Sequence, residues 1–462
     1  MSKTFRPWDV DQAWLLPPSV RELVPEDHVV HFVRELAREE LDLSAILGAY
    51  KEERGYPPYH PVMMTALLLY AYTQGVFSSR KIARACEERV DFMAVTAMQT
   101  PDHRTVCEFR RRHLDALAGL FGQVLHLCQR AGLVKLGHVA LDGTKVKANA
   151  SKHKAMSYER MLKAEPELAA EVQRWFQRAG EEDAAEDVQH GRERRGDVLP
   201  TWAVSKQRRL EKLREARAAI EAEAKAEAEA RAADKAAAEK ARAEGSPAPA
   251  PTVKHPKHHI DGTPNAKAQR NFTDPESKLL RTRDTYVQGY NAQVAVDSSS
   301  QVIVAQMLMR EQNDVHALGP MLRLIKAFTG KQARELSADT GYCSEDNLRL
   351  LVRHHVRGYV ATGRIKHGSG EISNALGRTP GTRTYAMRQR LARAGHRSRY
   401  RLRKQVVEPV IGQIKSAMGF AHFHLRGVWK TAREWGLVCA AHNLRKLAKA
   451  VLPALSSYPR SR

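Results

Sequence analysis

The order of the predicted strands and helices is the feature that most constrains how this chain can fold. Alternating apolar residues predict a first strand at 137–147, and a hairpin at 286–296 and 301–309 whose turn is Asp297-Ser298-Ser299-Ser300. Downstream, the pattern alternates between helix and strand, in the order helix 315–328, strand 334–338, helix 345–354, strand 358–362 and a helix near 408–419. A hairpin followed by such alternation predicts an α/β chain (α+β overall) with a mixed five-stranded sheet flanked by helices.

A charged segment interrupts this order between the first strand and the second. Residues 205–244 consist almost entirely of Ala, Glu, Lys and Arg, and hardly any large apolar residue follows Ile220. Such a segment has high helix propensity but can bury little surface, and about forty helical residues would extend about 60 Å. We therefore predict a long helical insert at the surface over 160–268, with a Pro-rich tether at 246–251.

Residues 1–130 predict an all-helical N-terminal unit. Amphipathic or apolar helices are indicated at 23–41 and 62–74, and a short helix at 80–89 follows Ser78 and Ser79. Another helix is predicted to begin at Thr105, with Glu108 completing a capping box, and it carries Arg110, Arg111 and Arg112. Two short helices around a turn, the second one basic, are typical of a helix-turn-helix DNA reader. A helical bundle with a solvated basic face explains the pattern equally well.

Composition and charge narrow the class of protein. The chain has 462 residues with 75 Lys and Arg against 52 Asp and Glu, a net charge of +23, which predicts a polyanionic partner. The longest apolar run, Val62 to Tyr72, is far shorter than the roughly 20 residues that cross a bilayer, and no secretory signal is visible. Five scattered cysteines without a CxxC motif predict a reduced, cytoplasmic protein with neither a disulfide framework nor a zinc site.

Three carboxylates stand out by their positions. Asp142 lies inside the first strand, Asp339 directly follows the strand 334–338, and Glu408 lies among basic residues. A carboxylate in a sheet is costly unless it is paired or binds a cation, and the glycine that follows Asp142 allows close approach. If the three converge, their oxygen ligands suit Mg²⁺ or Mn²⁺, and two such ions can hydrolyse a phosphodiester. Taken singly, Asp339 could be a helix cap and Glu408 part of a surface ion pair.

These carboxylates lie in long blocks that resemble the bacterial insertion-sequence transposases of the DDE type. The blocks run over nearly the whole chain and in the family's order. They are FRPWDVDQAWLLPPSVRELVPEDH, GYPPYHPVMMTALLLYAY, FSSRKIARACEERVDFMAVTAMQTPDHRTVCEFRRRH, LDGTKVKANASKHKAMSYERM, TDPESKLLRTRDTYVQGYNAQVAVD, ELSADTGYCSEDN, YVATGR, VVEPVIGQIKSAMGF and EWGLVCAAHNLRKL.

The resemblance implies an RNase H-like catalytic core with Asp142, Asp339 and Glu408 as catalytic, metal-binding triad, holding two Mg²⁺ (or Mn²⁺) ions. The implied enzyme cleaves DNA at the terminal inverted repeats of an insertion sequence and transfers the strands into target DNA. Its partner would be double-stranded DNA, with no membrane involved, and it would act as a homodimer on paired ends in the bacterial cytoplasm, associated with the nucleoid. A catalytically inactive end-binding protein or repressor, and an RNase H-like nuclease without strand transfer, are the alternatives.

Several basic residues near the triad are candidate DNA contacts. Related transposases often place a Tyr and an Arg before the Glu and a Lys seven residues after it. Here Lys415 lies at the Lys position, seven residues after Glu408. Lys404 lies at the Arg position, with Arg403 next to it, and Tyr400 is one residue away from the Tyr position. Pro409 suits the first turn of a helix, which would put Glu408 at the N-cap and keep Tyr400 and Lys404 off its face.

Other polar and aromatic residues allow two interpretations each. Lys145 and Lys147 could contact phosphate or lie on a solvated edge of the sheet. Asn291 and Gln293 could support the site or face solvent, and Trp429 and Trp435 could stack on a base or, more simply, pack in the core.

The expected organisation has four parts. They are a helical DNA-binding unit at 1–130, a catalytic unit at 131–159 plus 269–425, the insert at 160–268, and a C-terminal helix with a basic tail at 426–462. The role of the insert stays open, because end binding, dimer contact and a passive spacer all fit its composition.

Overall fold

The computed structural model describes residues 19–20, 22–50, 58–190, 201–243, 259, 261–282, 285–365, 372–373, 377, 379–394 and 399–456. The Pro-rich tether predicted at 246–251 lies outside these residues, as do most of the first block of the family resemblance and the last residues of the chain. None of the described helices combines the length and the apolar character that a membrane span requires.

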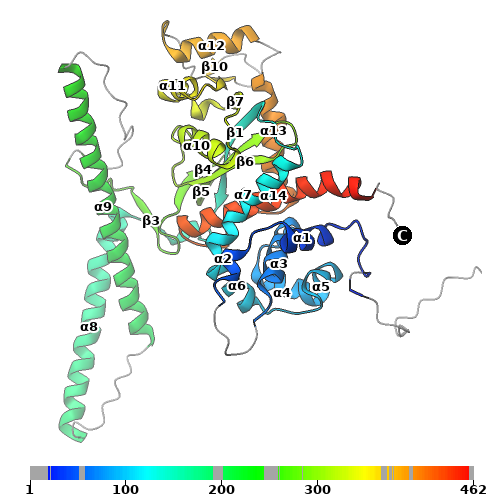
Figure 1. The fold of residues 1–462 in the computed structure, drawn as a ribbon. Coiled ribbons are helices and arrows are strands. Elements are labelled where there is room, and N and C mark those ends of the chain that lie inside the picture. Colours follow the sequence, from blue (N-terminus) through cyan, green and yellow to red (C-terminus); the bar gives the residue numbers. More distant parts are fainter. Residues whose placement is uncertain are drawn as a thin grey trace, which may run out of the picture.

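A mixed sheet forms the centre of the described chain (Figure 1). Its strands are β1 (His138–Lys147), β4 (Lys278–Arg281), β5 (Tyr286–Asp297), β6 (Ile303–Met309), β7 (Glu335–Ala338) and β8 (Arg357–Val360). The order is β4-β5-β1-β7-β8, with β6 also paired to β5. Strand β1 is antiparallel to β5 and parallel to β7, and β7 is parallel to β8. This arrangement confirms the predicted RNase H-like mixed sheet.

The sheet has one strand more than the five predicted. The additional strand, β4, pairs with the first residues of β5, and β6 pairs with the residues that follow along the same edge. Strand β4 has only four residues, Lys-Leu-Leu-Arg, and its two apolar residues are adjacent. It therefore lacks the apolar alternation that identified the other strands. The downstream helices are α10 (Leu318–Thr329), α11 (Glu345–Arg353), α12 (Arg383–Ala394) and α13 (Leu402–Gly412), and two short strands pair separately, β9 (Arg364–Ile365) and β10 (Ile372–Ser373).

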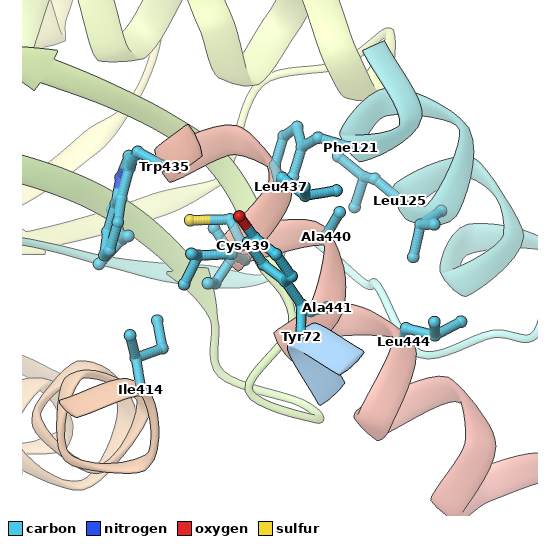
Figure 2. Close-up of a cluster of buried hydrophobic side chains, with 14 of the residues drawn as sticks. Tyr72, Phe121, Leu125, Ile414, Trp435, Leu437, Cys439, Ala440, Ala441 and Leu444 are labelled. Atoms are coloured by element: carbon cyan, nitrogen blue, oxygen red, sulfur yellow. The ribbon is translucent and has the colours of Figure 1, made fainter. Parts of the chain in front are cut away.

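The C-terminal helix α14 (Val428–Ser456) joins the sheet to the N-terminal helices. It packs against β6, α7 (Leu114–Arg130) and α3 (Pro61–Thr73). Figure 2 shows its side chains, among them Trp435, Leu437 and Cys439, lying near Tyr72 of α3, Phe121 of α7 and Ile414. The buried residues of the helices and the sheet form a single hydrophobic cluster. The hydrophobic core is therefore continuous across the boundary expected at residue 130.

The N-terminal helices are α1 (Val29–Glu39), α2 (Ser44–Leu47), α3, α4 (Ser79–Glu88), α5 (Val90–Thr96) and α6 (His103–Arg112). The predicted cap at Thr105 is wrong, because α6 begins two residues earlier and Asp102 caps it, accepting a hydrogen bond of 2.6 Å from the amide of Thr105. Helix α5 lies between α4 and α6 in the sequence, so the two are not joined by a single turn, although they pack directly on each other.

The insert forms a long helical arm beside the body of the protein (Figure 1). It consists of α8 (Tyr158–His190) and α9 (Thr201–Ala243), which pack together around a small apolar cluster of Met161, Leu213 and Ile220. Strands β2 (Ala155–Ser157) and β3 (Gln269–Asn271) pair at the base of the arm, so the chain enters and leaves the insert through adjacent strands. The arm confirms the predicted helical insert.

Glu223 fastens the arm to the body. Its carboxylate accepts hydrogen bonds from Arg270 of β3 at 2.8 Å, from Lys278 of β4 at 3.1 Å and from Arg310 after β6 at 3.2 Å. Burial alone would raise the pKa of Glu223, but Lys278 and Arg270 more than offset that effect and lower it to about 2. One carboxylate in α9 therefore holds basic side chains from three segments of the body.

We expect Glu223→Gln to loosen the contact between arm and body by about 1 kcal/mol, because the pairing is screened by solvent at a side chain that is 40% exposed. The pKa is lowered on folding, so this stabilisation is present above the ordinary glutamate pKa of 4.5 and is lost as the pH falls toward 2. Hydrogen–deuterium exchange of α9 around Glu223 should be about fivefold faster in the variant at pH 7. Glu229→Gln, at an exposed position of the same helix, is the control; equal exchange in both variants would contradict this account.

Candidate active site

Parallel pairing of β1 with β7 brings Asp142 and Asp339 together. Leu141 lies opposite Ala338, so the next residue of each strand, Asp142 and Asp339, occupies the same register and the same face of the sheet. Asp339 follows the last residue of β7 and caps a short 3₁₀ turn (Thr340–Tyr342), where its carboxylate accepts a hydrogen bond of 2.8 Å from the amide of Gly341. The side chain thus caps the turn, as one interpretation of the sequence held, and also lies beside Asp142.

Glu408 lies inside a helix rather than at its start. Helix α13 begins at Leu402, and Pro409 lies within it, so the predicted N-cap position of Glu408 is wrong. A proline cannot donate to the carbonyl four residues before it, here that of Gln405. That carbonyl accepts a hydrogen bond of 3.1 Å from Nε2 of Gln301, which satisfies the carbonyl that Pro409 leaves unpaired. A π-helical turn (Gln413–Ala417) continues α13, so the helical segment ends at Ala417, close to the predicted end at residue 419.

Arg403 joins two of the three carboxylates. Its guanidinium lies 2.6 Å from Oδ2 of Asp142 and 3.4 Å from Oε1 of Glu408. Arg403 and Asp142 are nearly buried, with side chains 11% and 16% exposed, whereas that of Glu408 is 50% exposed. The two carboxylates, which come from β1 and α13, therefore converge on one cation. The spacing of the family motif put Lys404 in the Arg place, whereas the side chain that contacts Asp142 and Glu408 is that of Arg403.

Lys404 shares a helix face with Glu408, contrary to the prediction, whereas Tyr400 lies beside Arg403. Because α13 extends back to Leu402, Lys404 is one turn before Glu408 on the same face, and it is exposed. Tyr400 precedes the helix in a 3₁₀ turn (Arg399–Arg401) and lies beside Arg403. Burial raises the pKa of Tyr400, and the charge of Arg403 partly offsets that effect.

The electrostatics of the site centre on Asp142. Burial raises its pKa to about 6; Arg403 acts in the opposite direction, and Asp339 adds to the increase. A buried carboxylate beside another carboxylate is unfavourable when charged, unless a cation is present. The environment of Asp142 is therefore one that a bound cation would stabilise.

The three carboxylates have the chemistry of a divalent-metal site. Oxygen donors at Asp142, Asp339 and Glu408 suit Mg²⁺ or Mn²⁺. Within the part of the chain that the structure describes, no three His, Cys, Asp or Glu side chains are close enough together to bind a metal as they stand. The guanidinium of Arg403 lies between Asp142 and Glu408 instead. The donor set fits a divalent cation that would replace this arginine as the partner of both carboxylates.

Two lysines near the triad, Lys415 and Lys145, donate hydrogen bonds to backbone carbonyls, whereas Lys147 is exposed. Nζ of Lys415 donates a hydrogen bond of 2.8 Å to the carbonyl of Lys145, and burial lowers the pKa of Lys415. Nζ of Lys145 donates to the carbonyl of Gln312 at 2.9 Å. The edge position suggested for Lys145 and Lys147 is wrong, because β1 is a central strand, although Lys147 at its end is exposed.

The three arginines of α6 have different environments. Arg110 is buried, and its guanidinium donates to the carbonyl of Phe77 at 2.9 Å, to Oγ of Ser79 at 3.0 Å and to the hydroxyl of Tyr72 at 3.3 Å. The prediction that Arg110, as part of the basic helix of a DNA reader, contacts DNA is therefore corrected, because its side chain is buried and both of its terminal nitrogens donate inside the protein. Arg111 and Arg112 are exposed; Arg111 pairs with Glu108, and Arg112 donates to the carbonyl of Ala49.

The remaining candidates separate into buried and exposed residues. Asn291 and Gln293 are fully buried, which rules out the solvent-facing interpretation. Trp435 is buried in the core and donates to the carbonyl of Gln293 at 3.3 Å, so it packs as expected. Trp429 is 46% exposed, and the guanidinium of Arg433 stacks on its ring.

We expect Arg110→Met to lower the free energy of unfolding by about 2–4 kcal/mol, because it leaves acceptors at Phe77, Tyr72 and the half-buried Ser79 without their donor. Arg111→Met should change it by less than about 0.5 kcal/mol, since this side chain is exposed and paired only within its helix. Urea unfolding followed by circular dichroism measures both values. Similar losses in the two variants would show that Arg110 does not have the internal role described above.

Stability should also depend on pH through Asp142. Its pKa is about 6 in the folded protein against 3.8 for an ordinary aspartate, so the buried charge costs nothing well below pH 3.8, and its cost grows as the pH rises from there through 6. Without divalent ions, Asp142→Asn should therefore gain stability over the wild type between pH 4 and pH 7, by up to about 3 kcal/mol. Thermal unfolding across this range in a chelating buffer tests this; a difference that does not change with pH would contradict it.

Comparison with known families supports the same interpretation. A model described as "Transposase domain (DUF772)" matches residues 18–112, and one described as "Transposase DDE domain" matches residues 251–444. The second match contains Asp339 and Glu408 but begins at residue 251, in the last part of the insert, so Asp142 lies outside it. No curated protein and no solved structure gave a match. The two matched segments together span more than half of the chain, which belongs to the insertion-sequence transposases of the DDE type.

Proposed function

We propose that this transposase cleaves DNA at the ends of its insertion sequence and transfers the strands into target DNA, with Asp142, Asp339 and Glu408 as its catalytic residues. The convergence of carboxylates from β1, β7 and α13 beside one arginine carries this proposal. Transposases of this family act on DNA and generally use divalent metal ions. Bound Mg²⁺ or Mn²⁺, in our proposal two ions, would activate the attacking oxygen and stabilise the leaving oxygen of the phosphodiester.

The side chains around the triad would bind and orient the DNA. Arg403 presents a planar guanidinium that can bind phosphate in a bidentate manner once a divalent cation takes over its carboxylate partners. Lys404 on α13, Lys147 at the end of β1, and Arg111 and Arg112 on α6 are exposed, so these four are our candidates for contacts with the DNA backbone. Lys415 donates to the strand that carries Asp142, so we assign it to orienting that strand, with a phosphate contact as an additional role.

Action on paired ends would require two copies of the chain, so we propose a homodimer on DNA. The net charge of +23 favours binding to both ends and target through their phosphates. Such binding weakens steeply with salt whether or not the protein is active, so salt dependence does not separate a transposase from a nuclease or from an end-binding repressor.

The test is cleavage and strand transfer with a labelled duplex that carries the DNA flanking this gene, in Mg²⁺ or Mn²⁺. We expect Asp142→Asn, Asp339→Asn and Glu408→Gln each to slow cleavage at least about a thousandfold, or about 4 kcal/mol, and to leave end binding largely intact. Glu39→Gln, at an exposed site on α1, is the matched control.

The products distinguish the alternatives. Cleavage at the repeat tips together with joined products supports the transposase; cleavage without joining indicates a nuclease. Specific binding without cleavage by the wild type under either metal indicates a repressor. A variant that retains wild-type cleavage removes its residue from the triad.

A further inference from the structure

A buried polar network lies on the face of β1 opposite Asp142. Asp314, in the loop after β6, turns its carboxylate toward β5, where Oδ1 accepts hydrogen bonds of 2.7 Å from Nδ2 of Asn291 and 2.7 Å from Nε2 of Gln293. Nζ of Lys145 lies 3.8 Å from the same oxygen. A helix was expected from residue 315, directly after Asp314, but α10 starts at Leu318, and the Asp314 carboxylate pairs with the sheet instead.

Gly143, the residue after Asp142, makes room for this network. A Cβ atom at this position would lie 2.2 Å from Nε2 of Gln293 and 2.8 Å from Oδ1 of Asp314, closer than nonbonded atoms can approach. The glycine therefore admits the Gln293–Asp314 pair directly against the strand that carries Asp142. This is a different use from the ligand approach that the sequence suggested.

Tyr342 connects the network to Asp339. Its hydroxyl donates a hydrogen bond to Oε1 of Gln293, and its carbonyl accepts one of 2.8 Å from Nδ2 of Asn347. Tyr342 is the last residue of the 3₁₀ turn that Asp339 caps, and its side chain is fully buried. Burial raises the pKa of Tyr342 well above its usual value, so the hydroxyl keeps its proton and remains a donor.

A second hydrogen bond ties the same two loops together. Nδ2 of Asn347 also donates to the carbonyl of Val315 at 2.7 Å, one residue after Asp314. Tyr342, the last residue of the turn that Asp339 caps, is thus held by two hydrogen bonds, one at its hydroxyl and one at its carbonyl. Gln293 links the hydroxyl to Asp314, and Asn347 links the carbonyl to Val315 in the same loop. The amide of Gly341, which donates to the Asp339 carboxylate, lies inside this fixed turn.

We propose that Tyr342, Gln293 and Asp314 are positioning residues that hold the Asp339 carboxylate in the geometry a divalent cation requires. The proposal rests on the proposed function, because it assigns Asp339 to the metal. In this proposal the three residues act by fixing the turn and do not themselves bind the cation. Residues that orient metal ligands commonly change metal affinity about 10–100-fold when they are removed.

The experiment measures Mn²⁺ binding to the full-length protein by electron paramagnetic resonance, alongside DNA cleavage and thermal unfolding. We expect Tyr342→Phe, which loses only the hydroxyl, to weaken Mn²⁺ binding about tenfold and to slow cleavage in subsaturating Mn²⁺. Tyr290→Phe is the matched control. Tyr290 lies fully buried on β5 and donates to Oδ1 of Asp274 at 2.8 Å, so the variant loses a comparable hydrogen bond outside the network and should bind Mn²⁺ as the wild type does.

Two substitutions at Asp314 separate its hydrogen bonds from its charge. Both hydrogen bonds from the β5 amides end on Oδ1, so Asp314→Asn can keep them, whereas Asp314→Ala loses both. We expect Asp314→Ala to weaken Mn²⁺ binding about tenfold and Asp314→Asn to stay within about threefold of the wild type. If Asp314→Asn is as impaired as Asp314→Ala, the charge of Asp314 acts on the metal and its positioning role is overturned.

The outcomes also separate this inference from the proposed function. A wild type that binds no Mn²⁺ at the triad refutes the proposed function, and this inference with it. A wild type that binds Mn²⁺ while Tyr342→Phe and Asp314→Ala bind it equally well refutes the inference alone. If Tyr342→Phe does not fold, the comparison of Asp314→Ala with Asp314→Asn decides the question.

Discussion

The parallel pairing of β1 with β7 is the constraint on which the candidate site depends. It places Asp142 and Asp339 at one register of neighbouring strands, and α13 then adds Glu408 from above the same face. Strand β1 can carry this pairing because β5 covers its other edge, so its backbone groups are satisfied on both sides. A shift of one residue between β1 and β7 would turn either aspartate to the opposite face and separate the pair. The arm is inserted between β1 and β5 in the sequence, outside both strands, so it does not interrupt the pairing of β1 with β7.

Keeping these carboxylates together lowers the stability of the folded protein. Burial and the charge of Asp339 raise the pKa of Asp142, and Arg403 provides the compensating positive charge. Such an arrangement is typical of sites that have to hold a cation or a charged substrate, because a structural ion pair could be replaced by apolar packing at little cost. Next to the site, Tyr342 donates a hydrogen bond to Gln293, and Gln293 donates one to Asp314. These bonds hold the turn that Asp339 caps in one conformation.

Much of the fold could be predicted from the sequence, because it depends on local patterns, and the same patterns located the three carboxylates within a strand, directly after a strand and at the helix predicted near 408–419. Apolar alternation located five strands of the sheet, and the helical character of the arm followed from its composition. The rest depended on contacts between distant segments. Arg403 reaches Asp142 only because α13 extends back past Pro409, and that extension depends on Gln301 satisfying the carbonyl of Gln405. Arg110 resembles a surface arginine in sequence, and only the packing of α3 and α4 around it buries the side chain. No local pattern distinguishes Asp314 from a helix cap, since its partners lie about twenty residues earlier on β5.

The most direct test of the central claim, that Asp142, Asp339 and Glu408 form one divalent-metal site, is anomalous diffraction from crystals of the protein soaked in Mn²⁺. We predict an anomalous peak within coordination distance of Asp142 and Asp339, about 2.2 Å, with Glu408 directed at it and the guanidinium of Arg403 displaced. Peaks only elsewhere in the molecule, with Arg403 still bridging Asp142 and Glu408 at saturating Mn²⁺, would contradict it.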